Sequence, residues 1–140
     1  MDSYRSLGAW QRSHTLCVET LRALDAVYHP PAQAVFEQLR RAVVSVETNV
    51  VEGYALGSGE EFREHLRIAL GSAAQADALL NIAEELGYLP GDKLERLRRS
   101  AGLTIGALHG LLRSLTHTAR VAEPDASAPV GHVTDSFSTA

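Results

Sequence analysis

The residues that could support metal or acid–base chemistry in this chain are its six histidines and their acidic neighbours. A di-iron site in a helical bundle needs a glutamate on each of two helices and Glu-x-x-His on the two others. No histidine here has an acid three residues before it, and Glu61 and His65 have the one-turn spacing of a surface pair. His14 and Cys17 fall on an apolar face, where a packed histidine and a small core residue are expected. We therefore predict no metal, no cofactor, no small-molecule substrate and no enzymatic activity.

Polar side chains also follow one flank of the second predicted helix, at Gln38, Arg41, Ser45, Asn49 and Glu52. Half-buried polar groups must find partners, so these residues are expected to bond to one another and to neighbouring helices. Two interpretations stay open. The flank sets the register of helices and subunits, which is the preferred interpretation, or it binds a ligand.

Four amphipathic segments must position these residues. Spacings of three and four predict a first helix over residues 4–28, a second over 32–55, a third from Ser58 to Leu86 and a fourth after Asp92. The first places seven residues on one face, and the fourth places seven more on another: Leu7, Trp10, His14, Cys17, Leu21, Leu24 and Tyr28, then Leu94, Leu97, Ala101, Ile105, Leu108, Leu112 and Leu115. Pro and Gly separate the segments, and Ser58 can cap the third. These features predict an all-α, antiparallel up-and-down four-helix bundle.

Composition predicts one bundle domain over residues 1–120 and a disordered acidic tail over 121–140. The single cysteine, the absence of a signal-like start and the lack of an apolar run of about 20 residues favour a cytoplasmic protein without a membrane segment. All 13 basic residues lie in the first 120 residues, where 14 of the 17 acidic residues also lie. Such a near-neutral domain argues against strong nucleic-acid binding by a monomer, although two local basic clusters are candidate contacts: Arg40 with Arg41, and Arg96 with Arg98 and Arg99.

Two predicted surfaces are more apolar than a monomer needs. Val44 and Val51 share a direction on the second helix, about 130° from the centre of its main apolar arc. Gly102, Gly106 and Gly110 recur every four residues on the fourth helix, and each costs about 1 kcal/mol relative to alanine inside a helix. Close approach of another helix usually offsets that loss, so we predict a homo-oligomer.

The second-helix sequence resembles a known family signature. Gln38-Leu-Arg-Arg-Ala-Val-Val-Ser45, followed by Asn49-Val-Val-Glu52-Gly53, is similar to the signature of the bacterial four-helix-bundle family first noticed in intervening sequences of large-subunit ribosomal RNA genes. The resemblance covers roughly residues 5–117. It implies an antiparallel four-helix bundle, with relatives that form pentameric rings, including the accessory variability proteins of diversity-generating retroelements. Gln75 departs from the pattern, because the family often has Glu there.

Two functional hypotheses follow. The first is a non-catalytic homo-oligomeric scaffold or adaptor, pentameric by the resemblance, that works through protein contacts. The second is an accessory protein that binds RNA or DNA, in which a ring concentrates modest basic patches through multivalency. A salt-dependent binding assay separates them, because binding to nucleic-acid phosphates weakens steeply with salt.

Overall fold

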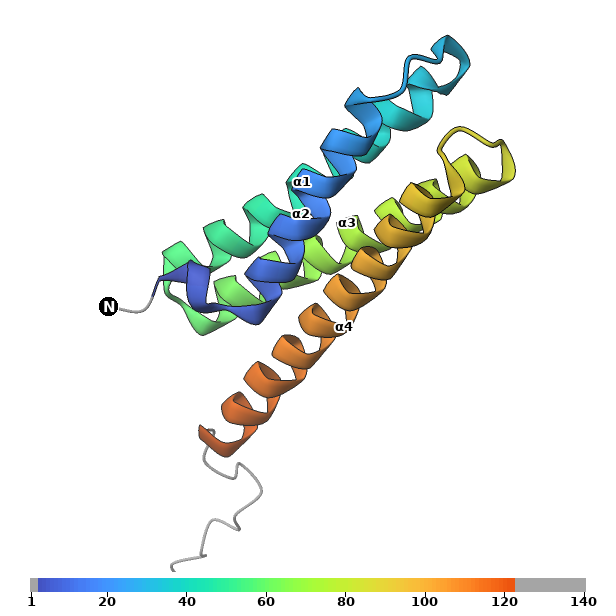
Figure 1. Ribbon diagram of the computed structural model, residues 1–140. Coiled ribbons are helices and arrows are strands. Elements are labelled where there is room, and N and C mark those ends of the chain that lie inside the picture. The colour runs from blue at the N-terminus through green and yellow to red at the C-terminus, as the bar shows by residue number, and fades with distance from the viewer. Residues whose placement is uncertain (1–2, 123–140) are drawn as a thin grey trace, which may run out of the picture.

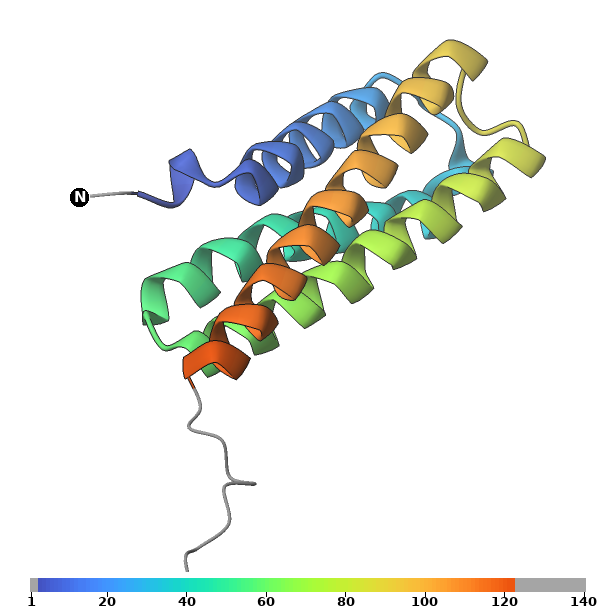
Figure 2. The same cartoon turned by 90° about the horizontal axis from the view of Figure 1, so that it is seen from below.

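The computed structural model describes the backbone of residues 3–122 and the side chains of residues 3–118. Its four long helices are α1 (Gly8–Asp25), α2 (Gln33–Leu56), α3 (Gly59–Glu85) and α4 (Gly91–Ala122), with short 3-10 helices η1 (Tyr4–Ser6) and η2 (Pro30–Ala32). Consecutive helices run in opposite directions (Figure 1), and each packs against its two neighbours around the bundle. Figure 2 shows the same four axes from below. The predicted antiparallel four-helix bundle is confirmed.

The predicted tail falls almost wholly outside the described residues. Its first two residues, 121 and 122, are the last residues of α4, and residues 123–140 are not described. Within residues 3–122, no helix combines the length and the apolarity needed to cross a bilayer.

Local chemistry sets the turns between the helices. Gly57 ends α2 with φ 72°, a left-handed conformation that favours glycine. Ser58 then caps α3, because its side chain accepts a hydrogen bond from the backbone N–H of Glu61 at 3.3 Å. Gly87 has φ 67° after α3, and Pro90 immediately precedes α4. The turns at Gly57 and Gly87 therefore lie where expected, whereas α1 is shorter at both ends than the helix predicted over residues 4–28. Gly53 lies inside α2.

The predicted inward face of α1 is partly wrong. His14 has a half-exposed side chain, and Tyr28, which follows the end of α1, is 88% exposed. The residues that α1 buries are mostly small: Ala9, Ser13, Leu16, Cys17, Thr20, Ala23 and Leu24. The Ser13 hydroxyl donates to the carbonyl oxygen of Ala9 at 2.6 Å, which lets a polar side chain enter the core. The buried face of α1 is therefore rotated from the predicted one. Small residues, including the polar Ser13 and Thr20, lie where α1 contacts the other helices.

The core forms two clusters along the bundle. The closed end, beside the α1–α2 and α3–α4 turns, contains Leu24, Phe36, Leu80, Leu89 and Leu97 with twelve further buried residues. The half-open end, beside the α2–α3 turn, has seven fully buried residues and nine that are only partly buried: Leu7, Trp10, Phe62, Leu70, Ile105, Ala107, Leu111, Leu112 and Leu115. All seven residues of the predicted apolar face of α4 pack in these two clusters. The residues toward the C-terminal end of that face, Leu112 and Leu115, lie in the half-open end and are only partly buried.

Candidate functional site

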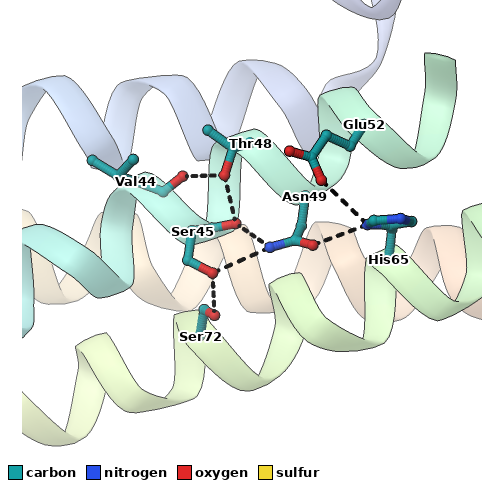
Figure 3. Close-up of polar contacts among 7 residues, drawn as sticks. All are labelled: Val44, Ser45, Thr48, Asn49, Glu52, His65 and Ser72. Carbon is teal, nitrogen blue, oxygen red and sulfur yellow. Dashed lines mark hydrogen bonds and ion pairs between the residues drawn. The ribbon is translucent and has the colours of Figure 1, made fainter.

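A chain of polar side chains joins α2 to α3 near the middle of the bundle (Figure 3). The Asn49 amide nitrogen donates to the backbone carbonyl of Ser45 at 2.9 Å and contacts the Ser45 hydroxyl at 3.2 Å. The two hydroxyls of Ser45 and Ser72 lie 2.9 Å apart. On the other side, the Asn49 carbonyl oxygen lies 3.0 Å from Nδ1 of His65. Since that oxygen can only accept, Nδ1 of His65 carries the proton.

Glu52 completes one end of this chain. Its carboxylate lies 3.9 Å from Nδ1 of His65, which is ion-pair distance but too long for a hydrogen bond (Figure 3). Ser45, Asn49, His65 and Ser72 are all half-buried, whereas Glu52 is exposed. The arrangement therefore fixes the register of two helices and leaves one carboxylate at the surface.

Gly53 makes this close packing possible. A Cβ atom added at Gly53 would lie 2.7 Å from Cβ of His65 and 3.1 Å from Cδ2 of Phe62. Real Cβ atoms essentially never approach so closely, so only glycine fits at this crossing of α2 and α3. The glycine that ends the recognised motif is thus a packing residue rather than a helix terminator.

The structure brings together three of the five residues predicted on the polar flank. Gln38 and Arg41 are exposed, and the Arg41 guanidinium lies 3.9 Å from Glu37 on the same helix. They take no part in the chain through Asn49. Sequence reasoning missed His65 as a partner, because it compared that histidine only with Glu61 on its own helix.

The two predicted oligomer surfaces face outward. Val44 is 42% exposed and Val51 is half-buried. On α4, Gly102 and Gly106 are exposed and Gly110 is half-buried. A Cβ atom added at any of the three glycines would meet nothing within 4 Å. No helix of this chain, as far as it is described, packs closely on the glycine stripe.

Beside α2, a small polar cluster ties α1 into the bundle. The His14 ring stacks on Trp10, with centroids 4.8 Å apart, and its Nδ1 lies 2.8 Å from the Glu47 carboxylate. Burial raises the pKa of the Cys17 thiol from 9.0 to about 11, and the neighbouring Glu47 carboxylate adds to the rise. A thiol that stays protonated is a poor nucleophile, so we interpret Cys17 as a packing residue of the core.

Most of the predicted nucleic-acid contacts face carboxylates. Four of the five arginines form ion pairs. Two pairs join different helices, Arg40 with Asp25 and Arg98 with Glu84. The other two lie within one helix, Arg41 with Glu37 and Arg99 with Glu95. Arg96 instead lines a groove between α1 and α4 with Arg22, Lys93 and Glu19. The pairs on the surface contribute little to stability, but they neutralise the local charge that a phosphate backbone would need.

Among the residues with described side chains, no three His, Cys, Asp or Glu residues come together in a way that could hold a metal ion. The polar groups between α2 and α3 form hydrogen bonds with one another. As far as the described side chains show, the site is a hydrogen-bonded network between two helices, with the exposed Val44 beside it on α2.

Comparison with known proteins supplies the family. A search of curated proteins finds no match. The model of the family described as 23S rRNA-intervening sequence protein matches residues 5–110, which span α1, α2, α3 and most of α4. The match includes the Ser45–Asn49–Gly53 motif and its partners on α3. The chain therefore belongs to the 23S rRNA-intervening sequence protein family.

Proposed function

We propose that this protein is a non-enzymatic homo-oligomeric scaffold or adaptor that acts through protein contacts. The observation that carries the proposal is the contrast between two kinds of glycine. Gly53 costs helix stability, but the close contact with His65 explains it within the chain. Gly102, Gly106 and Gly110 carry the same cost, and nothing in the described part of the chain packs on them.

A second copy of the chain is the partner that we infer for this stripe. Leu103 lies beside this stripe and is 46% exposed, so one large apolar side chain borders the small residues. Val44 adds an exposed apolar residue on α2. Small residues allow helix backbones to approach closely, and an exposed leucine supplies apolar area to bury. A pentamer is the assembly expected from the family resemblance, and a cytoplasmic location is part of the same proposal.

The test is the mass of the particle in solution at micromolar concentration, measured by sedimentation velocity and light scattering. We expect the wild-type protein to be larger than a monomer. Leu103→Glu places a charge beside the stripe, so it should shift the protein toward monomer. Ile82→Glu is the matched control, because Ile82 is 44% exposed on α3, and it should leave the mass unchanged. A wild-type monomer, or equal effects of both variants, would contradict the proposal.

The alternative of an RNA- or DNA-binding accessory protein has less support at the residues predicted for it. Four of those five arginines already have carboxylate partners, as described above. If nucleic acid binds there, affinity should fall steeply as salt rises, and Arg40→Gln should weaken it.

A further inference from the structure

A second groove with basic side chains lies between α3 and α4, away from the polar chain. Six residues line it: Arg67 from α3, and His109, Leu112, Arg113, Thr116 and His117 from α4. His109, Arg113 and His117 repeat every four residues, so their Cα atoms follow one another by about 6 Å along the helix axis. Arg67 contributes a guanidinium from the opposite wall. The groove therefore gathers four basic side chains from two helices.

The charges in this groove are not neutralised as those of Arg40, Arg41, Arg98 and Arg99 are. No carboxylate lines it, and neither Arg67 nor Arg113 has a carboxylate within ion-pair distance among the described residues. The acidic residues near Arg67 are Glu60 and Glu64, which line an adjoining groove that Arg67 shares. Both belong to α3, so the wall formed by α4 presents only basic and neutral groups to this groove.

From this geometry we propose that the α3–α4 groove binds a phosphate group, and that binding strengthens as the pH falls from 8 to 6. Arginine binds phosphate oxygens with two parallel hydrogen bonds, so Arg67 and Arg113 supply the permanent contacts. Histidine changes charge within the physiological range, and a protonated ring donates from both nitrogens. His109 and His117 place two such rings in the groove beside the two guanidinium groups.

The remaining lining residues shape the site. The Thr116 hydroxyl donates to the Leu112 carbonyl at 2.9 Å, so its proton is engaged and it is not a donor to the ligand. Leu112 is half-buried and forms an apolar floor. Two sources can supply the phosphate: a free phosphate ion or the phosphodiester backbone of a single-stranded nucleic acid. Both offer the same oxygens to the two arginines, and the experiment separates them.

One arm of the test uses a rhodamine-labelled 12-mer of thymidine, whose phosphodiester charge is constant between pH 6 and pH 8. Fluorescence anisotropy at low salt should give about tenfold tighter binding at pH 6.0 than at pH 8.0, as expected for an added charge-assisted hydrogen bond. The other arm titrates inorganic phosphate at pH 6.0 and follows the ring resonances of His109 and His117 by NMR. Binding in one arm alone identifies the source. The absence of binding in both arms overturns the proposal.

Variants test the location. Arg67→Gln with Arg113→Gln should weaken binding at least tenfold at both pH values. His109→Gln with His117→Gln should leave binding at pH 8.0 unchanged and remove the gain at pH 6.0. Arg12→Gln with Arg22→Gln is the matched control, since it removes two exposed charges from α1, and binding should stay within about threefold of wild type. All six residues lie at or near the surface, and thermal unfolding checks that each variant folds. Equal losses in the control and the first pair overturn the proposal.

Discussion

Replacing Gly53 by alanine tests how closely α2 and α3 approach. The new Cβ atom would lie 2.7 Å from Cβ of His65, whereas ordinary contact begins at 3.4 Å. The helices must therefore separate by about 0.7 Å at this point, or the backbone must distort. Cβ of His65 cannot rotate away because it is attached directly to the backbone. A shift of that size also stretches the 3.0 Å contact between Asn49 and His65 beyond hydrogen-bonding distance.

These effects have opposite signs. Overpacking a helix contact costs about 1–3 kcal/mol, and the lost hydrogen bond costs about 1 kcal/mol more. Alanine returns about 1 kcal/mol through its higher helix propensity. The net expectation for Gly53→Ala is a loss of about 1–3 kcal/mol in the free energy of unfolding. In a domain of this size the midpoint of thermal unfolding should fall by about 4–12 °C.

The assay is urea unfolding followed by circular dichroism at 222 nm, at one fixed protein concentration because assembly would affect apparent stability. Gly71→Ala is the matched control. Gly71 lies inside α3, it is exposed, and a Cβ atom there would meet nothing within 4 Å. It should raise stability by up to about 1 kcal/mol. Equal stabilisation by the two substitutions would refute the close approach at Gly53.

Two further predictions concern the polar and titratable groups. The pKa of the Cys17 thiol is 9.0 in the unfolded chain and about 11 in the folded protein. Between these pH values the unfolded chain loses a proton that the folded protein keeps, so the free energy of unfolding should fall by up to about 2 kcal/mol as the pH rises. Cys17→Ala should flatten the stability profile measured by urea unfolding over that window; an unchanged profile would contradict the raised pKa. Asn49→Ala should cost about 1–3 kcal/mol, because Ser45 and His65 lose their shared partner. The control Gln38→Ala, at an exposed residue of α2 outside this polar chain, should change stability by less than about 0.5 kcal/mol. Both variants are measured by urea unfolding. If their losses were similar, the hydrogen bonds of Asn49 would contribute no more to stability than an exposed side chain does.

The sequence predicted the helices and turns well because their signals are local. Ser58 caps α3, and Gly57 takes the left-handed conformation after α2, each through interactions within a few residues. The large leucines of α4 also point inward as their spacing indicated. Such features need no knowledge of a neighbouring helix, so periodicity and turn chemistry are sufficient to find them.

The contacts between helices could not be predicted in the same way. His65 bonds to Asn49 only because α2 and α3 pair in one register, and no spacing within either helix specifies that register. The pairing of Arg40 with Asp25 depends on the placement of α1 against α2. Spacing alone places His14 with the large apolar residues and gives no sign that the polar Ser13 and Thr20 are fully buried.

The difference between the two ends of the bundle gives the molecule unequal local stability. At the closed end, most of the core is fully shielded, so its backbone can open only if several helices separate together. At the half-open end, Leu111, Leu112 and Leu115 are each only partly covered, so α4 can detach there while exposing little additional apolar surface. Local opening of this kind requires less free energy than global unfolding. The terminal turns of α4 are therefore expected to open before the rest of the fold does.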